Sequence, residues 1–238
     1  TGNSFWNIIC SVRPHVLRNF ASHSQPMSAL VEMNFWSKRT IVEDGHQYWR
    51  SYFHFKGDYD VVPIFVPIYQ DALMSNTYVK TLKAQFIQLR RWAYGASDIP
   101  YVAIRLFSWK REMPFWPLFS RFLRLIDSHL TLAAIPVIIA FGGWIPIFIN
   151  GTAPLSVAAN QLPEVLGVVQ RLALAGLVVM VFLSFKLLPE RPAHYKRHRN
   201  VGMVLQWVLM PVIALVYTSA SAYYSQTRLF MGRYMTKF

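Results

Sequence analysis

The sequence predicts a fold in two parts, an α/β domain followed by a membrane α-helical region. The first half combines helical patterns with one β-branched and aromatic run, whereas the second half holds long stretches almost free of charge. Of the 238 residues, 54% are hydrophobic and 16% aromatic, with a mean hydropathy of +0.27. This composition is too apolar for an ordinary soluble domain, and the length suffices for one domain plus a membrane module.

The charge distribution indicates a membrane partner. The formal net charge is +13, a value that can indicate nucleic-acid binding. Most acidic residues, however, lie before residue 128 together with many Lys and Arg residues, which gives a mixed surface instead of a basic arm. Later positive charges lie between apolar runs, as in cytoplasmic membrane loops. We therefore expect membrane lipid as a partner, and no nucleic acid. Cys10 is the only cysteine, which excludes an intrachain disulfide.

Two adjacent carboxylates, Glu43 and Asp44, precede a predicted aromatic helix over residues 46–55. At a helix N-terminus, backbone N–H groups and the helix dipole favour the ionised form of a carboxylate. One interpretation of the pair is an N-cap. The other is a general base, which needs a carboxylate held ready to accept a hydroxyl proton.

A turn at residues 56–60 leads to residues 61–69, a β-branched and aromatic run that predicts a buried strand interrupted by Pro63 and Pro67. Asp58 and Asp60 on the turn match a D-x-D pattern that can hold a divalent cation. Because such three-residue matches arise often by chance, we assign no metal ligand in this chain.

Residues 78–93 predict a helix with an apolar stripe formed by Tyr78, Leu82, Phe86, Leu89 and Ala93. On the same wheel Gln88, Arg91 and Trp92 share another face, from which Arg90 is set apart. A guanidinium group can form paired hydrogen bonds with phosphate or carboxylate oxygens, and an indole can stack on a sugar or base. The alternative interpretation is an ordinary amphipathic helix with a solvated basic side.

The rest of the sequence predicts membrane structure. Aromatic residues alternate with Lys and Arg over residues 107–128, which favours an amphipathic helix in the membrane interface. Three spans follow at about 130–149, 165–188 and 201–224, within a membrane region of residues 129–238. The positive-inside rule places the basic loop 189–200 and the residues before 130 in the cytoplasm. Three crossings would place the basic tail outside, against that rule.

Taken together, the Glu43-Asp44 pair, the turn and strand, the Q-x-x-R-W pattern of Gln88, Arg91 and Trp92, and the membrane region resemble the membrane-integrated branch of family-2 glycosyltransferases. Cellulose, chitin and hyaluronan synthases belong to this branch. The resemblance implies a cytoplasmic GT-A-like catalytic domain, of which residues 1–106 would form the C-terminal part, and a location in the plasma (inner) membrane. Val42 departs mildly from the pattern, since many members have Thr there.

The resemblance also implies roles for the site residues. Asp44 would be the catalytic base with Glu43 beside it, and Gln88, Arg91 and Trp92 would bind the donor diphosphate and the acceptor sugar. The expected partners are a nucleotide-sugar donor, foremost a UDP-sugar, and a glycan or lipid-linked acceptor. Mg²⁺ or Mn²⁺ is the expected cofactor, but its carboxylate ligands lie upstream of the pair in the family and are not matched here. We therefore expect a chain that lacks the donor-binding half. A non-processive lipid-carrier glycosyltransferase and a non-enzymatic membrane scaffold or transport subunit remain alternatives.

Overall fold

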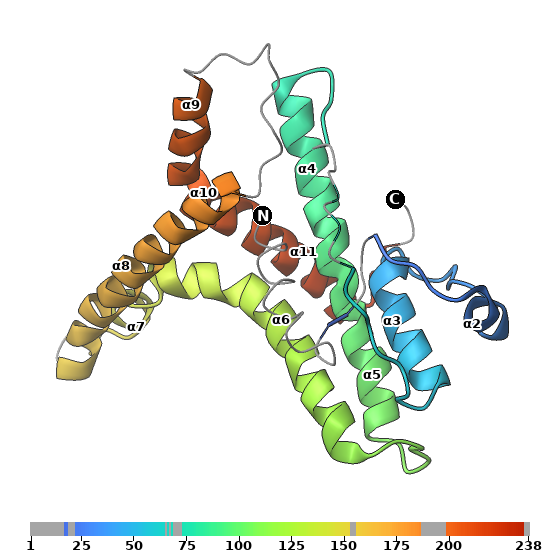
Figure 1. Cartoon of the computed structure of the whole chain (residues 1–238). Helices are drawn as coiled ribbons and strands as arrows, with labels where there is room; N and C mark the ends of the chain where they lie inside the picture. The colour runs from blue at the N-terminus through green and yellow to red at the C-terminus, as the bar shows by residue number, and fades with distance from the viewer. Residues whose placement is uncertain are drawn as a thin grey trace. The chain divides into compact units, whose positions relative to one another are not determined.

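A computed structural model of the chain describes residues 17–18, 22–64, 66, 68, 73–152, 156–186 and 199–235 (Figure 1). Most of these residues are helical, and none of them forms a β-strand. The helical elements are α2 (Met27–Glu32), α3 (Glu43–His54), α4 (Tyr78–Ala93), η2 (Tyr94–Ser97), α5 (Asp98–Leu106), α6 (Phe115–Phe141), α7 (Ile145–Ile149), α8 (Val157–Lys186), α9 (Arg199–Leu205), η4 (Gln206–Leu209), α10 (Met210–Ile213), η5 (Ala214–Ser219) and α11 (Ala220–Phe230).

The described residues fall into two compact units. The head unit comprises those from 17 to 131 and from 221 to 235, and the apolar unit comprises those from 132 to 220. The division therefore falls within α6 and at the start of α11. Each unit is described by itself below.

The core of the head unit is formed by α3, α5 and the first turns of α6. In α3 the aromatic residues Tyr48, Trp49 and Tyr52 lie one and three positions apart, so they share one face of the helix. Figure 1 shows α3 and α5 side by side, and their buried side chains belong to one hydrophobic cluster. Its buried members include Tyr48, Trp49, Tyr52, Val102, Leu106, Leu118, Phe122 and Leu125.

A polar network also secures α3. Gln47 and Ser51 are fully buried on this helix, so their polar atoms need partners. The Gln25 amide nitrogen donates to Ser51 Oγ (2.9 Å) and to the Tyr59 hydroxyl (2.8 Å), and the Gln47 amide nitrogen donates to Gln25 Oε1 (3.1 Å). The network connects α3 to the segments on both sides of it.

The predicted helix over residues 78–93 is α4, with the same bounds. It begins after Thr77, whose hydroxyl accepts a hydrogen bond from the Lys80 backbone N–H (3.3 Å), as expected of an N-cap. The expected apolar stripe is buried only at its end: Ala93 is buried, whereas Tyr78 is exposed. Figure 1 shows α4 continuing through η2 into α5, and the Ser225 hydroxyl of α11 donates a hydrogen bond to the Arg90 backbone oxygen near this end of α4.

The strand expected at residues 61–69 is not seen in the part of it that the structure describes, residues 61–64, 66 and 68. Side chains at alternate positions, Val62, Ile64, Val66 and Ile68, are exposed. A strand needs a neighbouring backbone for its hydrogen bonds, and Pro63 has no N–H to contribute. An α/β fold is therefore not observed within the described residues, because this segment has no strand partner there.

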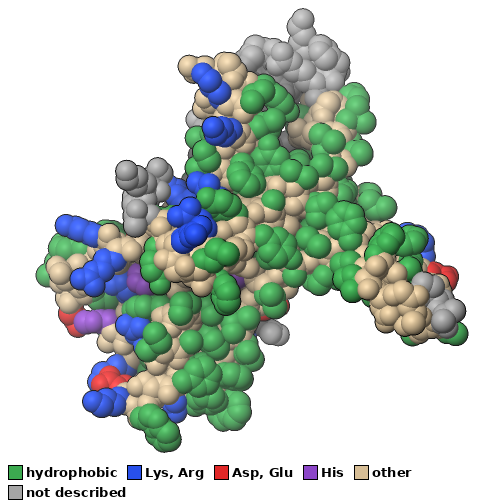
Figure 2. All heavy atoms as spheres, turned by 180° about the vertical axis from the view of Figure 1, so that it is seen from behind, with side chains coloured by type: hydrophobic (Ala, Val, Ile, Leu, Met, Phe, Trp, Pro, Cys, Tyr) green, Lys and Arg blue, Asp and Glu red, His purple; other side chains and the backbone are tan. Residues whose placement is uncertain are grey.

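Among the described residues, three helical segments are long and apolar enough to cross a membrane: Phe115–Phe141, Val157–Lys186 and Asn200–Phe230. The expected interface helix and first span are continuous in α6, which runs unbroken from Phe115 to Phe141. The basic loop expected at 189–200 lies mostly outside the described residues. Large apolar side chains are exposed on all three segments, and Figure 2 shows hydrophobic side chains spread over much of the visible surface. The chain thus has the character of a membrane protein.

Candidate functional site

The carboxylate pair opens α3, with Glu43 as its first residue. Val42 occupies the N-cap position without a side-chain cap hydrogen bond, so the interpretation of the pair as an N-cap is wrong. Glu43 is exposed and Asp44 half-buried, and Asp44 Oδ1 accepts a hydrogen bond from the backbone N–H of Gly45 (2.7 Å). Both carboxylates lie in the first helical turn, where the helix dipole favours negative charge. Neither is needed to cap the helix, which leaves the pair available for other chemistry.

The segment before α3 packs against the residue that follows α4. Ile41 and Val42, directly before the carboxylate pair, share one buried hydrophobic cluster with Tyr94. Val42 lies two positions before Asp44, and Tyr94 lies two positions after Trp92. The cluster therefore joins the flanks of the two parts of the sequence motif within the head unit.

The three α4 side chains of the motif differ in exposure. Gln88 and Arg91 are half-buried, whereas Trp92 is 55% exposed although it lies beside the buried Ala93. An exposed indole at this position is suited to stacking on a ring-shaped ligand. An amide and a guanidinium group nearby can bind hydroxyl or phosphate oxygens.

Arg90 contacts α11. Its guanidinium carbon lies 4.6 Å from the centre of the Tyr224 ring, and the Ser225 hydroxyl donates to its backbone oxygen (2.6 Å). Both contacts come from α11, so Arg90 secures the end of α4 against that helix. The separate role of Arg91 stays a prediction.

A hydrogen-bonded pair next to the carboxylates, His46 and Asp98, was not predicted from the sequence. His46 Nδ1 lies 2.5 Å from Asp98 Oδ1, and the His46 ring packs edge-on against Tyr101 with 4.6 Å between ring centres. Asp98 is buried at the start of α5, and His46 is two positions after Asp44 on α3. The pair thus positions the first turn of α3 against α5. No local sequence rule joins residues 52 positions apart.

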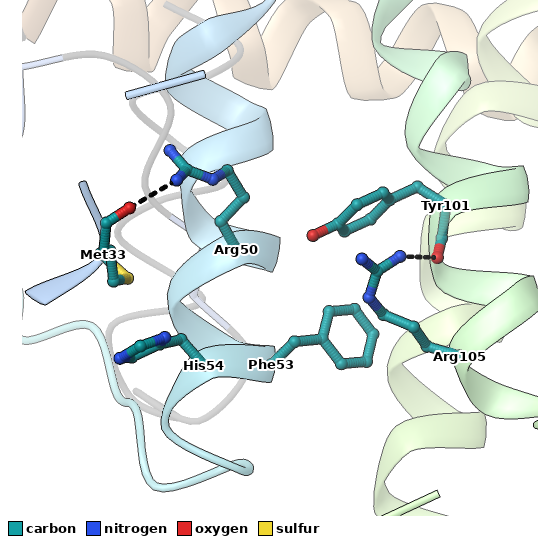
Figure 3. A pocket seen from close by; sticks show the side chains of 6 residues that line it. All are labelled: Met33, Arg50, Phe53, His54, Tyr101 and Arg105. Carbon is teal, nitrogen blue, oxygen red and sulfur yellow. Dashed lines mark hydrogen bonds between the residues drawn. The ribbon is translucent and has the colours of Figure 1, made fainter. Parts of the chain in front are cut away.

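A pocket of about 320 Å³ lies farther along α3 and α5 (Figure 3). None of the five predicted site residues lines it. Its lining side chains are Met33, Arg50, Phe53, His54, Tyr101 and Arg105.

The expected divalent cation has no ligand set in the part of the chain that the structure describes. No group of three or more His, Cys, Asp or Glu side chains there could hold a metal ion. The Mg²⁺ or Mn²⁺ cofactor therefore stays a prediction, and no ligand for it is assigned among the described residues.

Comparisons with known proteins give no match: no protein-family model matches the chain, and no curated protein or solved structure is significantly similar to it.

Proposed function

We propose that this chain belongs to an inverting, membrane-integrated glycosyltransferase related to the family-2 branch. It would transfer a sugar from a nucleotide-sugar donor, foremost a UDP-sugar, to a growing polysaccharide or glycan acceptor at the cytoplasmic face of the plasma (inner) membrane. The observation that carries the proposal is the buried cluster of Ile41, Val42 and Tyr94. It joins the segment just before the Glu43-Asp44 pair to the residue just after the helix that bears Gln88, Arg91 and Trp92. The three apolar helices support a membrane location.

A GT-A-like sheet is part of the proposal. The extended segment around residues 61–68 exposes Val62, Ile64, Val66 and Ile68 at alternate positions. Residues 61–68 are apolar at every position, as in a strand buried on both faces, and a sheet formed with other residues of the protein would bury them.

In the proposed reaction, Asp44 accepts the proton of an acceptor hydroxyl while that oxygen attacks the anomeric carbon of the donor. The bond from this carbon to the diphosphate oxygen breaks, and the departing diphosphate takes the electron pair. The Arg91 guanidinium group stabilises the negative charge that develops on the diphosphate, and Gln88 hydrogen-bonds to substrate oxygens. Trp92 stacks on the acceptor ring. Glu43 adds negative charge beside Asp44. These steps use side chains of this chain alone, and the Mg²⁺ or Mn²⁺ of the proposal would need ligands elsewhere in the protein.

The test of the base is Asp44→Asn in the complete gene product, including any sequence on either side of this chain, assayed in nanodiscs with radiolabelled nucleotide-sugars. We expect turnover to fall by about 10²- to 10⁴-fold, the usual contribution of a general base, with donor binding nearly unchanged. Asp58→Asn is the matched control, because Asp58 is exposed on the turn after α3. Full turnover by Asp44→Asn would contradict the base assignment.

Trp92→Ala tests the stacking role. Loss of an aromatic contact should weaken use of the acceptor by about twofold to tenfold while donor hydrolysis changes less. Trp109→Ala is the control, because Trp109 is fully exposed in the same unit. An acceptor KM and kcat equal to those of the wild type would count against stacking.

A non-processive enzyme that glycosylates a lipid carrier is the second candidate, favoured by the extent of apolar helix surface. Product length separates the two enzymes, because one makes a long polymer and the other a single-sugar lipid. Absence of turnover with every nucleotide-sugar would instead favour a membrane scaffold or transport subunit.

A further inference from the structure

The pocket between α3 and α5 gathers positive charge without a lining carboxylate. Figure 3 shows Arg50, Phe53 and His54 on α3 and Tyr101 and Arg105 on α5, and Met33, which follows α2, completes the lining. Its volume of about 320 Å³ is at the lower end of the range of small-molecule sites. The pocket belongs wholly to the head unit.

Most N–H donors of the Arg105 guanidinium group have no hydrogen-bond partner among the described residues. Its guanidinium carbon lies 3.6 Å from the centre of the Tyr101 ring and 5.1 Å from that of Phe53, so aromatic rings fix its position. Within the described residues its side chain makes one hydrogen bond, from Nη1 to the Tyr101 backbone oxygen (3.0 Å). Because a guanidinium group carries five N–H donors, most of them are available to a ligand.

Arg50 brings a second charge that no described carboxylate neutralises. Its three hydrogen bonds go to neutral acceptors: Met33 O (2.7 Å), Phe35 O and Gln47 Oε1 (3.0 Å). These contacts hold the guanidinium group in place but leave its positive charge unpaired. Two fixed guanidinium groups in one pocket favour an anion with several oxygens.

The acidic groups near the pocket have other partners. Glu32 Oε1 lies 2.9 Å from His54 Nε2, and the Glu32 side chain is mostly exposed. Asp98, which is close enough to Tyr101 to affect its phenol, is hydrogen-bonded to His46. Neither carboxylate therefore occupies the position of an anion between Arg50 and Arg105.

Tyr101 supplies a neutral donor. Burial raises the pKa of its phenol, an effect that the nearby Arg105 and Arg50 charges only partly offset. The phenol therefore keeps its proton at neutral pH and can donate it to an anion. In Figure 3 the Tyr101 ring extends from α5 towards α3, so the hydroxyl faces the side from which Arg50 and Phe53 come.

We propose that this pocket binds a phosphate group through Arg105, Arg50 and the Tyr101 hydroxyl. A phosphate group presents up to three terminal oxygens with more negative charge than a carboxylate, which matches donors from three side chains. The volume leaves room for a group attached to the phosphate beside the Phe53 ring. The phosphate can belong to a soluble molecule or to a lipid headgroup. The site is separate from the residues of the proposed transfer reaction and does not depend on that function.

The test is calorimetric titration of the full chain in detergent at neutral pH with sodium phosphate and with dihexanoyl phosphatidic acid. We expect at least one probe to bind, and Arg105→Ala to weaken binding by at least about tenfold, because it removes a charge-assisted donor pair. Tyr101→Phe should weaken it by about twofold to tenfold. Arg39→Ala is the matched control and should bind as the wild type does, because Arg39 is exposed and does not line the pocket.

Binding of inorganic phosphate would identify the soluble form as sufficient, and binding of the phosphatidic acid alone would identify a lipid headgroup. If Arg105→Ala does not fold, Tyr101→Phe decides, since it removes a single hydroxyl. The proposal is overturned if neither probe binds, or if binding is unchanged in the variants that fold. Sodium acetate bound as tightly as phosphate would also overturn it.

Discussion

The head unit and the apolar unit use the same residue types in opposite ways. In the head unit, Leu106 and Val102 are fully buried in a core with aromatic residues. In the apolar unit, Leu172 and Val178 are mostly exposed, and none of the most hydrophobic window of α8 is buried. Apolar side chains must leave water, but they need not leave hydrocarbon. The difference therefore indicates two solvents, water around α3 and α5 and lipid around α8. The parts of α6 and α11 that belong to the head unit are the ends of the other two apolar segments.

Polar groups support the same comparison. In the head unit, the buried Gln47 and Ser51 side chains both bond to the side chain of the distant Gln25, and Ser51 Oγ also donates to the Gln47 backbone oxygen. In the apolar unit, Ser184 Oγ donates to the Met180 backbone oxygen (2.7 Å) and the Gln170 amide nitrogen to the Ile139 backbone oxygen (2.7 Å). A bilayer core holds no water, so polar side chains there donate to backbone carbonyls. The other backbone N–H and C=O groups form hydrogen bonds within their own helix.

The largest contrast should come from removing a leucine side chain in each unit. Leu106→Ala leaves a cavity in a packed core and should destabilise the head unit by about 2–5 kcal/mol. Leu172→Ala, which removes the same atoms from an exposed position of α8, should cost less than about 0.5 kcal/mol. Hydrogen–deuterium exchange of α3 and α5 amides in nanodiscs would measure both. Equal losses of protection would contradict the two-solvent explanation.

The next largest difference should come from placing a charge on the exposed apolar surface of each unit. Val178→Arg places a guanidinium group where we expect lipid, at a cost of about 3 kcal/mol to membrane insertion. Val31→Arg, on the exposed side of α2 in the head unit, should cost almost nothing, since Val31 would face water. The fraction of protein resistant to carbonate extraction measures insertion. If both variants insert like the wild type, the exposed surface of α8 does not face lipid.

The smallest expected effect concerns alkaline pH and the head unit alone. Burial raises the pKa of Tyr48 to about 12, although Arg121 Nη1 donates a hydrogen bond to its hydroxyl (2.7 Å). The phenol of an unfolded chain titrates near 10, so the unfolded state loses its proton first as the pH rises. The contribution is fully present below pH 10 and is lost between about pH 10 and 12, amounting to about 2–3 kcal/mol.

Denaturant unfolding of the protein in nanodiscs, followed by tryptophan fluorescence across this pH range, would measure that loss. Tyr48→Phe has no phenol to titrate and should show a flatter decline. An equal loss of stability in the wild type and in Tyr48→Phe would contradict the assignment of this loss to the Tyr48 phenol.

Local patterns predicted the helices well and their burial poorly. The α4 helix has the bounds that its periodicity predicts, and the three apolar segments are helices in the structure. Burial of the apolar stripe of α4 was not predicted correctly, because periodicity identifies an apolar face but not what covers it. Tyr78, at the start of that stripe, is exposed. The strand predicted at residues 61–69 is not seen in the described part of that segment for a related reason, because a β-branched run does not determine whether a partner strand is present.

The candidate site divides in the same way. Glu43, Asp44, Gln88, Arg91 and Trp92 could be named from the sequence because residue types at short spacings identify them, and their chemical roles stay predictions. His46, Asp98 and the pocket residues could not be named. Their partners are distant in the chain, and only the packing of α5 against α3 brings them together.

The sequence by itself determined which segments form helices and which of them are apolar enough for a membrane. These properties depend on composition and on spacings of a few residues. The tertiary structure alone decided that Ile41 and Val42 pack against Tyr94, that Arg90 contacts α11, and that Arg50 and Arg105 line one pocket. Such contacts arise from burial of α3, α5 and α6 in a common core, a cooperative property that no single stretch of sequence contains.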